Sequence, residues 1–252
     1  MTMHASITDT DIISMLKHSS LPTILVEGDT DIAIIRRIQE RHNIELASLQ
    51  QCGGRNTLLK VYERRNEIKN VKVVFVADQD KYLYTGIPTD YADVVFTKGY
   101  SIENDLYHDS AIVGLMTNSD KAILTTIVSN FSKWYARQVY AIELGQEVEL
   151  DTNPHHIIFD YHPFDLQQTY QVADINIDQY RSTYDRVVSN YSLEIRGHSL
   201  MTIVGITFRN RPTGENRYGD KHLTEIAITA ANLPVHLNEL VNRIVNKLAE
   251  AN

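Results

Sequence analysis

The chain has 252 residues, of which 43% are hydrophobic and 22% are charged, and its formal net charge is −8. These values are typical of a globular protein with one large domain or two small ones. The acidic balance argues against a broad surface that binds nucleic acid regardless of sequence. The single cysteine, Cys52, excludes a disulfide framework and a cysteine-based zinc site. No N-terminal stretch has the pattern of a signal peptide, and no apolar run approaches the roughly 18 residues that span a membrane. We therefore expect a cytoplasmic protein.

The first half of the chain alternates between strand and helix patterns. A short leading helix is expected within 1–20, with Thr10 or Asp11 as its cap. Strands are expected at 22–27, 44–50, 71–78 and 92–97, and amphipathic helices at 29–43 and 56–70. This alternation predicts an α/β fold with a mainly parallel sheet and helices on both faces. In such sheets ligands bind at the carboxyl ends of the strands.

After about residue 115, helical patterns dominate. They are expected at 120–145, 176–195, 197–210, 222–233 and 234–252, whereas 155–164 is ambiguous. We therefore predict two domains, 1–115 with the parallel sheet and 116–252 as a mostly helical C-terminal lobe.

Acidic side chains follow two of the predicted strands. Glu27 ends the first strand, and Asp31 lies in the first turn of the next helix, where its side chain can point back toward Glu27. Asp78 and Asp80 end the strand at 71–78, and residues two apart in an extended segment face the same side. Like charges repel unless a cation lies between them, and carboxylate oxygens suit Mg²⁺ or Mn²⁺. An isolated acid after a strand is more often a helix cap, but two acidic strand ends on this spacing indicate a metal site.

The segments ILVEGDTD (24–31) and VVFVADQD (73–80) resemble the TOPRIM domain, which is shared by topoisomerases, bacterial primases, ribonuclease M5 and OLD-family nucleases. The resemblance covers about residues 21–110. It implies a Rossmann-like TOPRIM fold over 1–115, with Glu27, Asp78 and Asp80 as the catalytic, metal-binding acids. The E-G-x-T-D form is similar to that of OLD-type nucleases, which implies that Asp31 also holds metal. GYSIENDLY at 99–107 resembles their later acidic segment and adds Glu103 as a fifth metal ligand.

The rest of the chain narrows this resemblance. OLD proteins carry an ABC-type ATPase domain, but no P-loop motif occurs here. The segment RGHSL (196–200) and the helical second half resemble the DUF4435 group, which includes the AriB-type effectors of PARIS anti-phage defence systems. This resemblance implies a toxic metal-dependent endonuclease that is released from a separate, AriA-like ABC-type ATPase and cleaves RNA of the tRNA class. An OLD-like DNA nuclease, or a non-catalytic TOPRIM subunit that binds metal structurally, are the alternatives.

Four residues of the second half are candidates for contacts with the substrate. They are His198 in RGHSL and Arg209, Arg211 and Lys221 in the basic segment 209–222. Each has a structural alternative, a capping or packing role for the histidine and a solvated loop for the basic residues. His155, His156 and His162 also lie close in sequence, but without an adjacent acidic pattern they are more often ordinary strand and loop histidines.

The C-terminal segment carries an apolar stripe at helical spacing. The stripe consists of Leu237, Leu240, Val241, Ile244 and Leu248. Packing onto the rest of the chain is the simpler outcome, and pairing with a second copy is the alternative. We expect a homodimer once the effector is free of its ATPase.

Overall fold

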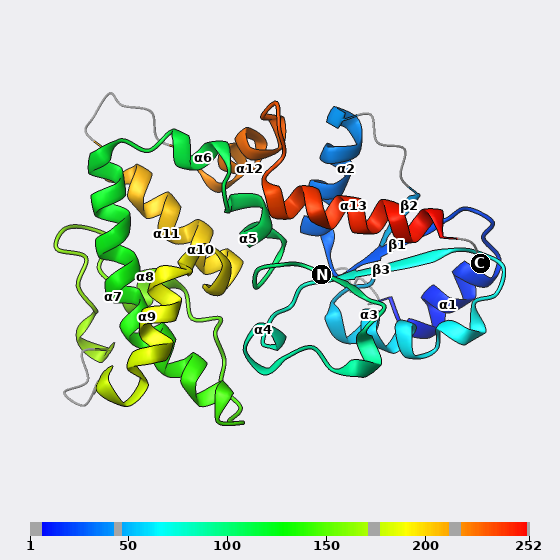
Figure 1. The fold of residues 1–252 in the computed structure, drawn as a ribbon, viewed down its shortest axis with the longest axis horizontal. Helices are drawn as coiled ribbons and strands as arrows, with labels where there is room; N and C mark the ends of the chain where they lie inside the picture. The colour runs from blue at the N-terminus through cyan, green and yellow to red at the C-terminus, as the bar shows by residue number, and fades with distance from the viewer. Residues whose placement is uncertain (1–6, 43–46, 171–176, 212–217, 251–252) are drawn as a thin grey trace, which may run out of the picture. The chain divides into compact units, whose positions relative to one another are not determined.

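The computed structural model describes residues 7–42, 47–170, 177–211 and 218–250 (Figure 1). The chain divides into two compact units, neither of which is continuous in sequence. Unit 1 consists of Met1–Asp78, Pro88–Thr97 and His236–Asn252, and unit 2 of Gln79–Ile87 and Lys98–Val235. The assignment of 1–115 to a TOPRIM domain and of 116–252 to a separate lobe stays a prediction, and the compact units have other boundaries.

Unit 1 is built on a four-stranded parallel sheet with the strand order β2-β1-β3-β4. The strands are β1 (Thr23–Val26), β2 (Ser48–Gln51), β3 (Val73–Ala77) and β4 (Val95–Phe96). Thr23 is paired with Ser48 on one side and with Val73 on the other. Every residue of β1 is buried, as is typical of a central parallel strand that is covered on both faces. The predicted α/β architecture with a parallel sheet is confirmed.

The strand order creates a switch point between β1 and β3. From β1 the chain passes through α2 (Asp29–His42) to β2 on one side, and then through α3 (Arg55–Glu63) to β3 on the other side. Crossovers between parallel strands are right-handed, so α2 and α3 cover opposite faces of the sheet. The carboxyl ends of β1 and β3 thus lie at the switch point, which is where open α/β sheets bind ligands.

The leading helix of unit 1, α1 (Asp9–Lys17), begins one turn earlier than the sequence indicates. Its cap is Thr8, whose hydroxyl accepts from the Asp11 amide at 3.2 Å while Asp11 accepts from the Thr8 amide at 3.0 Å. The prediction of Thr10 or Asp11 as the cap was wrong, because a reciprocal pair satisfies two of the amides that the first turn leaves without partners. Two 3₁₀ turns, η1 (Arg65–Glu67) and η2 (Thr89–Tyr91), lie in the connections of this unit. The last helix of the chain is α13 (Val235–Ala249).

Helix α13 packs onto unit 1 through its apolar stripe. Leu237, Leu240, Val241 and Ile244 are buried. Beside them, the Arg243 guanidinium donates to the carbonyl of Phe96 at 2.6 Å. The stripe thus takes the simpler of the two expected outcomes. It gives no support to a homodimer, which stays a prediction without this basis.

The described part of unit 2 is helical. Its longest element is α7 (Asn118–Glu143), which packs against α9 (Arg181–Ser189) and α11 (Gly197–Arg209) (Figure 1). The shorter elements are α4 (Tyr82–Thr85), α5 (Ile102–Tyr107), α6 (Ala111–Gly114), α8 (Pro154–Ile157), η3 (Gln168–Tyr170), η4 (Ile177–Tyr180), α10 (Tyr191–Glu194) and α12 (Asp220–Thr229). Helix α11 is buried on all sides from Ser199 to Phe208, so it forms the core of the unit. In the described ranges, no helix has the length and apolar content to cross a membrane.

A buried ion pair ties the start of α7 to the residue after α11. The Arg211 guanidinium donates to Asp120 Oδ2 at 2.7 Å and to the carbonyl of Leu115 at 2.7 Å. The two side chains are only 7% and 2% exposed. Burial acts to raise the pKa of Asp120, but hydrogen bonds from Arg211 and Thr117 outweigh it and hold that pKa below its usual value. Arg211 therefore has a structural role here and is not presented to a substrate phosphate, contrary to the expectation from the basic segment.

We predict that Arg211→Met lowers the free energy of unfolding by about 3–5 kcal/mol at pH 7, because it leaves the Asp120 carboxylate buried without its partner. Urea denaturation measures this change. The folded-state pKa of Asp120 lies below its unfolded value, so the pair contributes fully above about pH 4. That contribution is lost as the pH falls through the folded-state pKa, and the difference between variant and wild type should shrink on acidification. Arg209→Met, at a half-exposed arginine, is the control and should change stability by about 0.5 kcal/mol or less. Equal loss in both variants would contradict the assignment.

Candidate active site

Glu27 and Asp78 meet at the switch point of the sheet. Glu27 directly follows β1, and Asp78 directly follows the neighbouring strand β3. The Asp78 amide donates to Glu27 Oε1 at 2.9 Å. The Glu27 side chain is only 15% exposed, so its charge lies in a partly desolvated position. The structure thus places the backbone of Asp78 beside the Glu27 carboxylate, and the shared role of the two acids stays a prediction.

Asp31 lies on the same edge, in the first turn of α2. Its Oδ2 accepts from the Gly28 amide at 2.9 Å, so the side chain points back into the turn that follows β1. This contact is a helix-start bond of the kind that was the structural alternative for such an acid. Among the described residues, no three His, Cys, Asp or Glu side chains are placed to hold a metal ion together. The metal-ligand set therefore stays a prediction.

Arg55 is a residue of this edge that the sequence reasoning missed. Its guanidinium donates to the carbonyl of Asp78, and Nη1 lies 3.7 Å from Glu27 Oε1. The turn before it places it there. Gly53 and Gly54 have φ values of +74° and +128°, a conformation that favours glycine, and the Gly54 amide donates to the Glu27 carbonyl at 2.8 Å. The available signal was an arginine directly after a glycine pair, at the start of the helix that follows β2.

The charge of Glu27 also affects Cys52, which lies in the same turn. Burial, with the Glu27 carboxylate as the second cause, raises the pKa of the Cys52 thiol to about 12. The thiol is therefore neutral at physiological pH and fully buried. It is not a nucleophile of this site, because the thiolate is the reactive form.

Asp80 differs from its predicted placement. The expectation that Asp78 and Asp80 face the same side assumed an extended backbone, but β3 ends at Ala77 and Asp80 has a left-handed φ of 47°. Its amide donates to the carbonyl of Tyr100 at 2.8 Å. Aspartate adopts this conformation more readily than most residues. Asp78 and Asp80 therefore do not follow the alternating sides of a strand, because β3 ends at Ala77, one residue earlier than predicted. Asp80 belongs to unit 2 and Asp78 to unit 1.

The segment GYSIENDLY forms a hydrogen-bonded centre in unit 2. The fully buried Asp105 accepts from the amides of Lys98 and Gly99, at 2.9 and 2.8 Å. The fully buried Asn104 donates to the carbonyls of Ser192 and Ile195, at 2.9 and 2.8 Å. Asn104 therefore fixes the segment to the chain before α11, Asp105 fixes the turn that leads into α5, and both roles are structural.

Glu103 is the acid of this segment that is partly exposed. Its Oε2 accepts from the Ser101 hydroxyl at 2.5 Å. Both side chains press against Gly197, the first residue of α11. A Cβ atom at Gly197 would lie 2.0 Å from Ser101 Oγ and 2.9 Å from Glu103 Cβ. The glycine of RGHSL is therefore required by this close approach, and it sets the position of Glu103.

The remaining substrate candidates have mixed outcomes. His198 is exposed in the first turn of α11, and Arg209 is exposed at the end of the same helix. Both stay predictions. The side chain of Lys221 and residues 212–217 lie outside the described residues.

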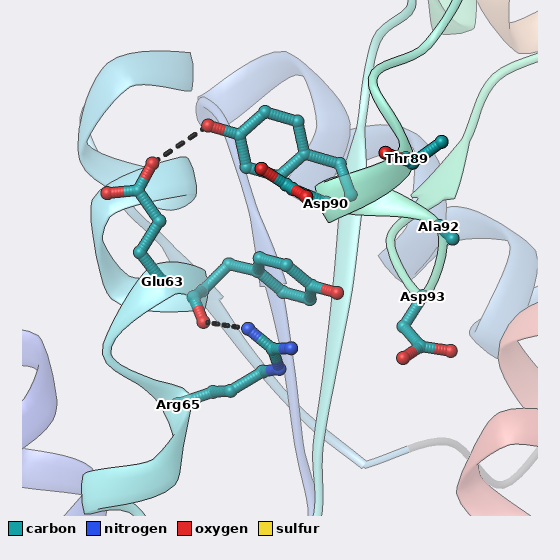
Figure 2. A pocket seen from close by; sticks show the side chains of 8 residues that line it. Glu63, Arg65, Thr89, Asp90, Ala92 and Asp93 are labelled. Carbon is teal, nitrogen blue, oxygen red and sulfur yellow. Dashed lines mark hydrogen bonds between the residues drawn. The ribbon is translucent and has the colours of Figure 1, made fainter.

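A pocket of about 520 Å³ in unit 1 is separate from the predicted site (Figure 2). Glu63 and Arg65 line one side and the segment Thr89–Asp93 lines the other. The polar groups of its wall bind one another: the Tyr91 hydroxyl donates to Glu63 at 2.8 Å and Arg65 to the carbonyl of Tyr62 at 3.0 Å. These internal bonds give no indication of a ligand.

We predict that Gly197→Ala lowers the free energy of unfolding by about 1–3 kcal/mol, although alanine is normally the better helix former. The new methyl group would collide with Ser101 and with the Cβ of Glu103, which cannot rotate away. Gly114→Ala, with open space around its Cβ, is the matched control and should be neutral. Urea denaturation of both variants checks this, and adding Ser101→Ala should restore part of the loss. A neutral Gly197→Ala would show that the close approach is not required.

No model of a known protein family matches the sequence, and no curated protein matches it either.

Proposed function

We propose that this protein is a divalent-metal-dependent nuclease of the TOPRIM type. The observation that carries the proposal is the meeting of Glu27 and Asp78 at the switch point of a parallel sheet, with their backbone and side chain in direct contact. This is the place where open α/β sheets bind ligands. A partly desolvated acidic edge has no structural need in the sheet itself, since the β1–β3 pairing ends before it.

The donor atoms fit Mg²⁺ or Mn²⁺ in their chemistry. Glu27, Asp31 and Asp78 offer carboxylate oxygens at one edge, and such hard ligands are those that these ions prefer. A positive charge of the protein already lies at this edge, because the Arg55 guanidinium is beside Glu27. Asp80 and Glu103, which belong to unit 2, stay predicted ligands from the sequence.

Each residue has a defined part in this proposal. Glu27, Asp78 and Asp31 would hold the metal, which would supply a Lewis acid for phosphodiester hydrolysis. Arg55 neutralises the acidic edge before substrate binds and then contacts the phosphate with its planar donor fork. His198 and Arg209 are exposed and are the remaining candidates for substrate contacts.

The substrate and the control of the activity follow from the resemblance. We propose RNA of the tRNA class as the substrate, and restraint by a separate, AriA-like ABC-type ATPase until phage infection releases the nuclease. A nuclease that acts in its own cytoplasm needs such restraint. An OLD-like DNA nuclease is the second candidate, and a TOPRIM subunit that binds metal without turnover is the third.

We predict that Glu27→Gln abolishes Mg²⁺-dependent cleavage, by at least about 100-fold, without unfolding the protein. The glutamine amide oxygen can still accept from the Asp78 amide, so the fold keeps its hydrogen bond while the site loses its charge. Cleavage of total RNA and of plasmid DNA is measured with and without Mg²⁺, and thermal denaturation reports the fold. Glu40→Gln, at an exposed glutamate, is the control. Undiminished cleavage by Glu27→Gln would remove the site assignment, and metal binding by the wild type without turnover would favour the non-catalytic subunit.

We predict that Arg55→Ala has opposite effects on metal binding and on cleavage. Removing the cation beside Glu27 should tighten Mn²⁺ binding about two- to fivefold, which corresponds to a partly exposed ion pair of about 0.5–1 kcal/mol. Cleavage should fall because the phosphate loses its guanidinium. Calorimetry with Mn²⁺ and a cleavage assay at saturating metal separate the two effects, with the exposed Arg37→Ala as control. Loss of metal binding in Arg55→Ala would show that the arginine supports the ligands instead of competing with the metal.

A further inference from the structure

A short loop of unit 2 exposes two aromatic rings. An antiparallel bridge between Ile158 and Leu166 closes the loop, which follows α8. Phe159 is 49% exposed and Tyr161 is 68% exposed. In the described part of the chain, they are the two aromatic members of a set of eight large hydrophobic side chains that face solvent. Since single exposed aliphatic side chains are ordinary, the pair of rings in one loop is the unusual feature.

The residue between the two rings anchors two hydrogen-bond donors. Asp160 Oδ1 lies 2.6 Å from His155 Nδ1, and Asp160 Oδ2 lies 3.6 Å from Arg209 Nη1. The backbone carbonyl of Asp160 accepts from Asn210 Nδ2 at 2.8 Å, which fixes the loop to the end of α11. One carboxylate therefore hydrogen-bonds an imidazole and forms a longer ion pair with a guanidinium.

Both side chains can still contact a ligand. A carboxylate accepts, so Nδ1 of His155 carries the proton of this bond, and the second ring nitrogen is directed elsewhere. The side chain of His155 is 32% exposed and that of Arg209 is 49% exposed. The guanidinium is the donor suited to a phosphate group, and the second nitrogen of the imidazole is an acceptor for a ribose hydroxyl.

We propose that Phe159, Asp160, Tyr161, His155 and Arg209 form a binding site for a nucleotide unit of single-stranded nucleic acid. Arg209 binds the phosphate, His155 accepts from the ribose hydroxyl, Asp160 holds both side chains, and Tyr161 and Phe159 each stack on a base. Exposed aromatic rings beside a basic group are the common means of binding single strands without sequence preference. The nature of the ligand rests on the proposed nuclease function, but the site is distinct from the switch point in unit 1.

A protein partner fits the same surface less well. A stable protein interface needs about 800 Å² on each side and an apolar centre. Here the apolar surface is interrupted by the ion pair, and Asp165 adds an exposed acid to the loop. The site has one positive charge, Arg209, against the two acids Asp160 and Asp165. It therefore binds mainly through stacking, and a weak dependence on salt is expected.

The experiment measures the binding of fluorescein-labelled decauridylate to the full chain by anisotropy, in EDTA. Tyr161→Ala and Phe159→Ala should each weaken the Kd by about five- to 150-fold, the range that the loss of one stacked base gives. Tyr161→Phe should bind like the wild type and Tyr161→Leu like the alanine variant, because leucine keeps the apolar surface but has no π-face. Arg209→Ala should weaken binding and lower the slope of log Kd against log salt by about 0.7.

Matched controls lie in the same unit. Leu144→Ala removes a hydrophobic side chain that is 59% exposed, and Arg181→Ala removes an arginine that is 54% exposed and paired with Asp178 at 3.0 Å. Neither should change the Kd. Wild-type binding by Tyr161→Leu would overturn the stacking assignment in favour of a protein-docking surface, and UMP competing as well as unlabelled decauridylate would overturn the assignment to a strand. Absence of oligonucleotide binding by the wild type would overturn the site altogether.

The binding assay is independent of catalysis, because EDTA removes the metal. Failure of Glu27→Gln to affect cleavage would overturn the proposed active site and leave this site standing. Loss of cleavage in Glu27→Gln together with unchanged binding in the loop variants would support the proposed active site and overturn the binding site in the loop.

Discussion

The architecture of unit 1 depends on how a carboxylate is accommodated at the end of a buried parallel strand. Glu27 follows four buried residues of β1, and its side chain is mostly withdrawn from water. A charge in that position is unfavourable unless hydrogen bonds and an opposite charge stabilise it. The Asp78 amide supplies the first and Arg55 the second. The glycine pair before α3 is needed because its turn places Arg55 beside Glu27.

Unit 2 also contains polar side chains in its interior, and these are stabilised by hydrogen bonds to the backbone. Asn104 and Asp105 are fully buried, and they satisfy backbone groups of two separate segments. Each bond is local and oriented, so together they fix one arrangement of the chain around the start of α11. Glu103 is left as the acid of the segment that reaches the surface, because its neighbours have structural roles. Of the two acids in GYSIENDLY, Glu103 is therefore the candidate for a role in catalysis.

How much of this was predictable depends on the range over which each interaction acts. The parallel sheet follows from alternating apolar runs, and the meeting of Glu27 and Asp78 follows from the rule that parallel strands share a carboxyl edge. Arg55 and the Arg211–Asp120 pair connect residues 28 and 91 positions apart, and a side chain's partner at such a distance leaves no periodic pattern. The left-handed Asp80 was missed for another reason, since the end of a strand is the least certain part of any sequence pattern. The packing of α13 was open because an apolar stripe does not indicate which surface covers it.

The built-in cation bears on the choice between a catalytic and a purely structural metal. Structural metal sites stabilise folds because their ligands repel one another or stay unordered without the ion. Here the Arg55 guanidinium already lies beside Glu27, and the Asp78 and Gly28 amides already bind the carboxylates of Glu27 and Asp31. Folding of this edge therefore does not require a divalent ion, and an ion that only stabilised the fold would have little to add. An ion that binds there must displace the Arg55 guanidinium from Glu27 or lie beside it. Such a displacement is favourable only where the guanidinium has a second negatively charged partner. A substrate phosphate is such a partner, and for this reason the arrangement agrees better with the proposed catalytic metal than with a structural one.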